Sequence, residues 1–189
     1  MKRIILWNLV TLDGFFEGAR SWDLAFHKLA WGKELEQFSL EQLKAAGALL
    51  FGRVTYEGMA AYWTSARGED ADIMNSIPKF VFSKTLAKAD WNNTTLVKDH
   101  AEEEVAKLKR ESGKEIYIFG SAALSSTLTQ HGLIDEYRLA LVPVLLGKGN
   151  PLFKLDQKAE LKLLDARQLN NGCVILRYEP RNGGVPSTA

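Results

Sequence analysis

The sequence has few of the residues from which metal and disulfide sites are built. Its 189 residues include one cysteine, Cys173, and three histidines. A single cysteine excludes an internal disulfide and a cysteine-based metal cluster. His27, His100 and His131 do not have metal-ligand spacing with one another. We therefore predict no metal site, and we expect Cys173 to be a buried strand residue.

Excess charge of one sign and long apolar runs are absent too. The 24 lysines and arginines balance 23 acidic residues, which leaves a net charge of +1 and no long-range attraction to nucleic acid. The run from Leu139 to Leu146 is far shorter than the about 20 residues of a membrane-spanning helix. The N-terminus lacks a signal-peptide pattern. We expect a cytoplasmic protein that binds neither nucleic acid nor membranes.

What the sequence does contain is an alternation of strand and helix patterns. Helices are predicted over 34–46, 55–63, 69–76, 100–112 and 121–131, and they alternate with strands over 3–10, 48–51, 79–83, 94–97 and 116–119. The last third reads as strands over 136–145, 159–168 and 173–179, with a hairpin turn at 170–172. This order predicts one α/β domain over 1–180, with a mixed, mostly parallel sheet flanked by helices and antiparallel C-terminal strands. A disordered tail is predicted over 181–189.

Several local signals refine these boundaries. Gly47 is predicted to cap the end of helix 34–46. Asp99 and Glu102 are spaced as a capping pair for helix 100–112, in which Glu103 and Lys107 are spaced for an ion pair. The aromatic-rich segment 15–33 is expected to form a loop and a short helix.

Small residues follow the predicted strand 116–119. After Phe119 come Gly120, Ser121, Ala122 and Ala123, and the next large side chain is Leu124. A helix N-terminus carries free N–H groups and a partial positive charge, and small residues would let a phosphate approach them. The alternative is a short connection in which Ser121 caps the helix.

Two further strand ends carry groups that suit phosphate. Gly52, Arg53 and Thr55 follow one strand, and Ser83 with Lys84 follows another. Each alone is equally compatible with a capped helix or a solvated turn. Ligands of open α/β sheets bind outside the carboxyl ends of the strands, so three such ends indicate a dinucleotide.

Four segments carry a resemblance to a known family: TLDGFFEG (11–18), LLFGRVTYEGMAAYW (49–63), PKFVFSKTL (78–86) and IFGSAALSSTLTQHGLIDEYRLALVPVLLGKGNPLF (118–153). With them the chain is identified as a member of the dihydrofolate reductase-like superfamily. Within it, the chain resembles the C-terminal reductase domain of the bifunctional deaminase-reductase of bacterial riboflavin biosynthesis. The resemblance covers nearly the whole chain and implies a single-domain dihydrofolate reductase-like fold.

The resemblance also implies that NADPH is the cofactor. Gly52, Arg53 and Thr55 match the first phosphate-binding turn of the family, and Ser83 and Lys84 match the segment that meets the adenosine 2′-phosphate. The turn under the pyrophosphate corresponds to Phe119, Gly120, Ser121, Ala122, Ala123 and Leu124. Leu12, Asp13 and Gly14 match the mobile loop beside the nicotinamide. Dihydrofolate reductases have adjacent glycines and a basic residue where Ser121 to Ala123 stand here, so NADP selectivity would depend on Arg53 and Lys84.

The resemblance implies reduction of a small heterocyclic or sugar-linked substrate, with Asp13 and Asp23 as candidate catalytic acids. One version is 5-amino-6-(5-phosphoribosylamino)uracil reductase activity. An alternative is pterin or folate reduction, because Asp23 in WDLAFHK is similar to the pterin-binding acid of dihydrofolate reductases. Another is a non-catalytic nucleotide-binding sensor. No deaminase zinc pattern is present, and the apolar strands after residue 135 could form a homodimer surface.

Overall fold

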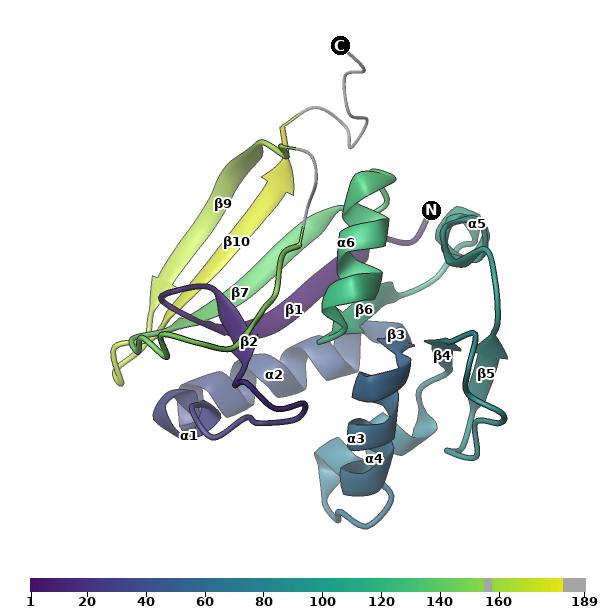
Figure 1. The fold of residues 1–189 in the computed structure, drawn as a ribbon, viewed down its shortest axis with the longest axis horizontal. Coiled ribbons are helices and arrows are strands. Elements are labelled where there is room, and N and C mark those ends of the chain that lie inside the picture. The colour runs from purple at the N-terminus through teal and green to yellow at the C-terminus, as the bar shows by residue number, and fades with distance from the viewer. Residues whose placement is uncertain (155–157, 182–189) are drawn as a thin grey trace.

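A computed structural model describes residues 1–154 and 158–181 (Figure 1). The predicted tail lies outside the described residues from 182 onward. The helices are α1 (His27–Ala30), α2 (Lys33–Ala45), α3 (Arg53–Trp63), α4 (Glu69–Ser76), α5 (Ala101–Arg110) and α6 (Ala122–Gln130). The strands are β1 (Ile4–Thr11), β2 (Phe15–Glu17), β3 (Ala46–Gly52), β4 (Lys79–Phe82), β5 (Thr94–Val97), β6 (Glu115–Phe119), β7 (Glu136–Val142), β8 (Asn150–Pro151), β9 (Leu161–Gln168) and β10 (Val174–Pro180).

Eight strands form one mixed sheet in the order β5-β4-β3-β6-β1-β7-β10-β9. Every pair from β5 to β7 is parallel, whereas β10 is antiparallel to both β7 and β9. This confirms the predicted α/β fold with antiparallel C-terminal strands. The carboxyl ends of the six parallel strands consequently share one edge of the sheet.

Helices cover both faces of this sheet. On one face, Leu35 of α2, Tyr56 of α3 and Met74 of α4 belong to one buried cluster with alternate residues of β1 such as Ile5. On the other face, α5 and α6 pack against a second set of buried residues. β1 lies between these layers, and all eight of its residues are buried, as its nearly continuous apolar sequence predicts. None of the helices within the described residues is long and apolar enough to cross a membrane.

Gly47 does not cap a helix, contrary to the prediction. α2 ends at Ala45 with Ala46 as its C-cap, and Gly47 already belongs to β3. The pairing of β3 with β6 shifts register between Ala46 and Ala48. A Cβ atom at Gly47 would lie 2.9 Å from the Cβ of Lys114. Glycine is thus required by the close approach of the chain at this irregularity.

The predicted capping pair of α5 is also wrong. The N-cap is His100, in the left-handed conformation (φ 53°), and no side chain caps the helix. The Asp99 carboxylate lies 3.6 Å from the Lys84 ammonium. Lys107 pairs with Glu104, three residues away, and not with Glu103. Local spacing alone did not identify these partners.

Segment 15–33 contains a strand that the sequence did not reveal. β2 pairs with β8, about 135 residues away in the chain, so no local pattern marks it. The predicted short helix is α1. β7 ends at Val142, three residues earlier than predicted, because Pro143 follows it. The hairpin turn at 170–172 is confirmed, with Gly172 at φ 85°.

Candidate active site

Two neighbouring parallel strands, β3 and β6, each end in a turn from which a helix starts (Figure 1). Hydrogen bonds join the two turns. The Gly52 N–H donates to the Ser121 Oγ at 2.7 Å, and the Ser121 N–H donates to the Thr55 Oγ1 at 3.0 Å. Thr55 and Ser121 are each 7% exposed. The turns predicted to bind phosphates therefore lie side by side and form one buried unit.

Neither of the two helix N-termini has a side-chain cap, because Gly52 has no side chain and the Ser121 hydroxyl is bonded to the Gly52 N–H. Ser121 occupies the N-cap of α6 with φ 61°, but its side chain does not cap the helix, and α3 at Gly52 likewise has no side-chain cap. The first helical hydrogen bond of α6 is donated by the Ser125 N–H to the Ser121 carbonyl. The N–H groups of Ala122, Ala123 and Leu124 therefore lack helical acceptors and form a ready anion site.

Asn8 of β1 forms a hydrogen bond with the turn that precedes α6. Its Oδ1 accepts a hydrogen bond from the Gly120 N–H at 2.9 Å, and Gly120 has the left-handed φ of 61° that favours glycine. Asn8 is 7% exposed, and its Nδ2 is buried without an acceptor among the described residues. Asn8 was not predicted, although a polar residue in the middle of an apolar strand is a signal visible in the sequence.

Two members of the predicted turn belong to the core. Phe119 and Leu124 are buried and pack on opposite faces of the sheet. Their side chains position the turn, and only backbone atoms of this segment remain for a ligand.

The cations expected at the adenosine end are exposed and already paired. The Arg53 guanidinium donates to the Glu57 carboxylate at 2.9 Å, and Lys84 lies near Asp99. The side chains of Arg53 and Lys84 are 45% and 81% exposed. The Ser83 Oγ accepts the N–H groups of residues 85 and 86 and holds its own turn. A phosphate here would have to compete with two carboxylates.

Asp13 is held on both of its oxygens. Oδ1 accepts a hydrogen bond from the Thr11 hydroxyl at 2.6 Å, and Oδ2 accepts one from the Gly147 N–H at 2.8 Å. The Thr11 hydrogen bond is the main reason that the pKa of Asp13 is lowered. Asp13 thus ties the turn Leu12 to Gly14 to the segment 145–149. Leu12 itself is largely exposed.

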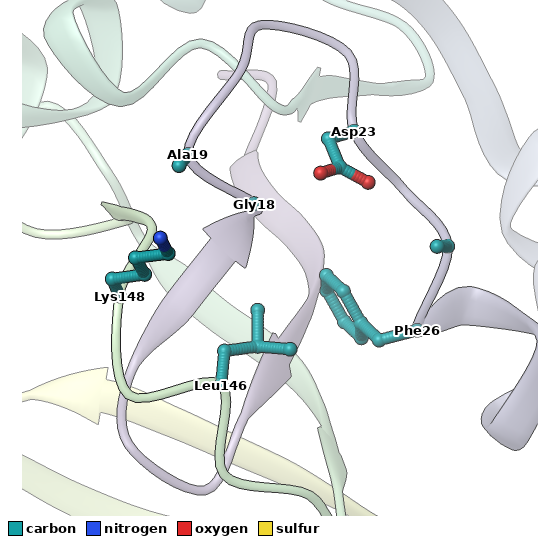
Figure 2. A pocket seen from close by; sticks show the side chains of 7 residues that line it. Gly18, Ala19, Asp23, Phe26, Leu146 and Lys148 are labelled. Atoms are coloured by element: carbon teal, nitrogen blue, oxygen red, sulfur yellow. The ribbon is translucent and has the colours of Figure 1, made fainter.

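Asp23, the second predicted acid, lines a cavity of about 250 Å³. Figure 2 shows its carboxylate on one side and Lys148 on the other, with Gly18 and Ala19 between them in this view and Phe26 and Leu146 below. The walls come from residues 18–26, here called the 18–26 loop, and from residues 146–148. Asp13 is bonded to the backbone of Gly147 in the second wall. Asp13 therefore contacts one wall of the cavity, and Asp23 belongs to the other.

The 18–26 loop is also held against α3. Trp22 has φ 66°, and its N–H donates to the buried Glu17 carboxylate at 2.8 Å. A Cβ atom at Gly58 of α3 would lie 2.5 Å from the Trp22 ring. The indole consequently lies directly on the backbone of α3. Burial lowers the pKa of His27, just beyond the loop, to about 4, so this imidazole is neutral at physiological pH.

The polar groups at the shared sheet edge could hold a polyphosphate ligand. They are the backbone N–H groups that begin α6 and the Arg53 guanidinium, which would have to leave Glu57, and both are donors; the Asn8 Nδ2 behind them is buried. The sequence identified the turns and Arg53. It missed Asn8, the competing acids Glu57 and Asp99, and the cavity residue Lys148, because each depends on tertiary contacts.

Comparisons with known proteins agree with this architecture. The RibD C-terminal domain family matches residues 2–175. The chain is 34% identical over 186 residues to the uncharacterized protein YyaP of Bacillus subtilis, with 94% of each chain covered. Among solved structures, a putative riboflavin biosynthesis protein from Shewanella sp. superposes with a TM-score of 0.79 at 20% identity, covering 95% of this chain and 99% of the other. Dihydrofolate reductase from Enterococcus faecalis, complexed with NADP(H), gives a TM-score of 0.64 at 11% identity, covering 95% and 97%.

Proposed function

The chain belongs to the RibD C-terminal domain family, and we propose that it is an NADPH-dependent reductase of the riboflavin-biosynthesis type. The observation that carries the proposal is the pair of uncapped helix N-termini, joined through Ser121 at the ends of β3 and β6. Such termini bind anions, and a dinucleotide supplies several phosphates. Family membership supports the same function.

The phosphate groups have different partners in this proposal. The N–H groups of Ala122, Ala123 and Leu124 would bind the pyrophosphate, with Gly120 and Ser121 shaping the turn. The first turn of α3, after Gly52, would contribute a second set of N–H groups. Arg53, Ser83 and Lys84 would meet the 2′-phosphate that distinguishes NADPH from NADH.

The substrate would lie beside the turn formed by Leu12, Asp13 and Gly14. Bound NADPH supplies a hydride for a C=N or C=O carbon of a small heterocycle. Asp13 uses both oxygens to hold the turn and the segment after β7, so we assign it a positioning role. Asp23 has its carboxylate at the cavity, where it would orient the substrate and relay a proton from solvent to the nitrogen or oxygen of the reduced bond.

A binding titration tests the cofactor assignment first. Nicotinamide fluorescence is followed as NADPH or NADH is added to the wild-type protein and to Arg53→Ala. We expect tighter binding of NADPH and loss of that preference in the variant. If neither dinucleotide binds, the reductase proposal is wrong. Oxidation of NADPH is then measured over pteridines, flavin precursors and quinones, and saturable binding without turnover would identify a nucleotide sensor.

Pterin or folate reduction is the second candidate, and the cavity favours it. Asp23 presents an acceptor-only carboxylate beside the Phe26 ring, an arrangement that suits a flat ring with N–H donors. Turnover of dihydropterins but not of 5-amino-6-(5-phosphoribosylamino)uracil would select this candidate, and the reverse preference would select the riboflavin-type reaction.

We also propose that the chain forms a homodimer through β9. This edge strand has eight residues, and Leu163 and Leu164 are 50% and 39% exposed. Long, exposed edge strands readily pair with another chain. Light scattering coupled to gel filtration should give twice the chain mass, and Leu163→Lys should give the monomer mass. A monomeric wild-type protein would contradict this proposal.

A further inference from the structure

Asn8 is a polar residue on a face of β1 that is otherwise apolar near it. Ile4 and Leu6, which share this face of the strand, belong to a buried cluster that includes residues of α5 and α6. Asn8 itself is only 7% exposed. A buried amide without a full set of hydrogen bonds lowers stability, whereas a leucine of similar size would not. We therefore looked for a role of Asn8 that an apolar side chain could not fill.

That role concerns the point at which β6 leaves the sheet. The parallel pairing of β1 with β6 ends at Trp7 and Phe119. The next residue after β6 is Gly120, which has φ 61°, and its N–H donates to the Oδ1 of Asn8 at 2.9 Å. Asn8 is in turn the next residue of β1. Its side chain thus supplies an acceptor just where the backbone ladder between the two strands ends.

The same hydrogen bond fixes the orientation of the amide. A backbone N–H only donates, so the atom of Asn8 that faces Gly120 must be the oxygen. The Nδ2 is then left without an acceptor among the described residues. An unpaired buried donor is destabilising, so the chain retains Asn8 at a cost in stability. The contact with Gly120 is what this cost provides.

Two side chains divide the N–H groups of this turn into bound and free ones. Asn8 accepts the N–H of Gly120, and the Thr55 hydroxyl accepts that of Ser121. Ser121 also has φ 61°, so two successive left-handed residues turn the chain. The N–H groups of residues 122–124 then begin α6 without helical acceptors. Holding the first two N–H groups fixes the direction in which the next three point.

We propose that Asn8 is a positioning residue of the cofactor site, whose neutral amide holds the Gly120 turn so that the N–H groups of residues 122–124 face the pyrophosphate. This rests on the proposed function, because it concerns the pyrophosphate of that cofactor. Asn8 acts through Gly120, since its own Nδ2 is buried. NADPH and NADH share the pyrophosphate, so Asn8 contributes to the affinity for both and not to the preference between them.

Three variants separate this role from a purely structural one. Asn8→Leu removes the acceptor of the Gly120 N–H, whereas Asn8→Asp keeps an acceptor and places a negative charge behind the free N–H groups. Gln42→Leu is the matched control. Gln42 is a buried amide too, 2% exposed, whose Oε1 accepts a hydrogen bond from Arg138 and whose Nε2 is unpaired among the described residues. It belongs to α2, on the other face of the sheet.

Urea denaturation measures the stability of each variant, calorimetry measures the affinity for NADPH and for NADH, and NMR follows the backbone amides of residues 120 and 122–124. We expect Asn8→Leu to weaken both dinucleotides about tenfold with their ratio unchanged. Asn8→Asp should weaken both more strongly, because its charge repels the pyrophosphate. Gln42→Leu should lower the midpoint of urea denaturation and leave both affinities unchanged.

The amide signals report the turn directly. The signals of residues 122–124 should shift on addition of NADH in the wild type and in Gln42→Leu, and much less in Asn8→Leu at the same concentration. Should Asn8→Leu fail to fold, Asn8→Asp, which retains an acceptor for Gly120, provides the test.

Unchanged affinities in either folded Asn8 variant would overturn the proposal. Equal losses in Asn8→Leu and Gln42→Leu would overturn it too, because they would reflect lost stability alone, and so would a loss confined to NADPH. In all these cases the wild type still binds the dinucleotide, and the reductase function stands. A wild type that binds neither dinucleotide would overturn both proposals together.

Discussion

The two ends of the expected dinucleotide site are built differently. At the β6 end, Thr55, Ser121 and Asn8 are buried, and three hydrogen bonds of 2.7–3.0 Å hold the turns. At the adenosine end, here called the β4 end after the strand that Lys84 follows, Lys84 and also Arg53, which follows β3, are exposed and pair with nearby acids. The first end would meet the pyrophosphate, which NADPH and NADH share, and the second would meet the 2′-phosphate.

This difference indicates how affinity and selectivity are divided. Buried hydrogen bonds hold donors in place before a ligand arrives, so they contribute to affinity for either dinucleotide. Exposed ion pairs contribute little and are screened by salt. We therefore expect strong binding of the common part of the cofactor and a modest, salt-dependent preference for NADPH.

The largest expected effect tests whether the anchoring of β4 contributes to the selectivity of the β4 end for NADPH. β4 begins at Lys79, which is fully buried and donates to the carbonyls of Met74 and Ile77 at 2.8 and 2.7 Å. Its ammonium lies 4.5 Å from the centre of the Trp91 ring. Lys79→Met should lower the free energy of unfolding by about 2–4 kcal/mol, because buried carbonyls lose their donor. Urea denaturation measures this loss.

If exposed charge alone sets selectivity, the ratio of NADPH to NADH affinity should be unchanged in Lys79→Met. A changed ratio would show that β4 itself contributes.

Burial also lowers the pKa of Lys79 to about 8. The unfolded chain, with a pKa near 10.4, then binds more protons between pH 8 and about 10.4, so this group adds stability as pH rises through that window. Lys79→Met should lack this rise.

Thr55→Val tests the buried end. The substitution keeps the shape of the side chain and removes the acceptor of the Ser121 N–H. An unsatisfied buried donor costs about 1–3 kcal/mol, so both dinucleotides should bind about tenfold more weakly with their ratio unchanged. Thr95→Val, an exposed change on β5, is the control. A loss confined to NADPH would contradict the division between the two ends.

Arg53→Ala should weaken NADPH about fivefold and NADH hardly at all, because the guanidinium is exposed and shared with Glu57. The effect should shrink at high salt. Glu57→Gln provides the opposite change, since it releases Arg53 and should tighten NADPH binding. Fluorescence titration at two ionic strengths measures both variants, and equal effects on NADH would contradict the assignment.

Lys84→Ala should have the smallest effect, about twofold on NADPH, because its ammonium is 81% exposed. Asp99→Asn tests its partner: binding of NADPH should improve slightly. A loss in Lys84→Ala larger than that in Arg53→Ala would reverse the order that exposure predicts.

Much of the fold could be predicted from the sequence because its signals are local. The apolar run of β1, the alternation up to α6 and the turn before Cys173 each depend on neighbouring residues. The strand β2 and the irregularity at Gly47 depend on partners distant in the chain, Asn150 to Pro151 and Lys114. No periodicity reports such partners, so these features were missed.

The same distinction holds for the candidate site. The small residues after Phe119 and the guanidinium donor Arg53 are visible in the sequence, and hydrogen bonds between Gly52, Thr55 and Ser121 join the two turns to which they belong. The use of Ser121 as a bridge in place of a cap was not visible, because its acceptor role depends on the left-handed backbone. The position of Lys148 at the cavity depends on the tertiary contact between residues 146–148 and the 18–26 loop, which the sequence does not show.

The contact of Trp22 with Gly58 joins two parts of the site that would bind different molecules. The indole belongs to the loop that carries Asp23, and Gly58 belongs to the helix whose first turn would face the cofactor phosphates. A ligand that restricts the motion of α3 would therefore also restrict the motion of the 18–26 loop, which would contact the substrate. Thermodynamic linkage is reciprocal, so we expect each ligand to raise the affinity of the other by the same factor. Filling one half of the site would then prepare the other half.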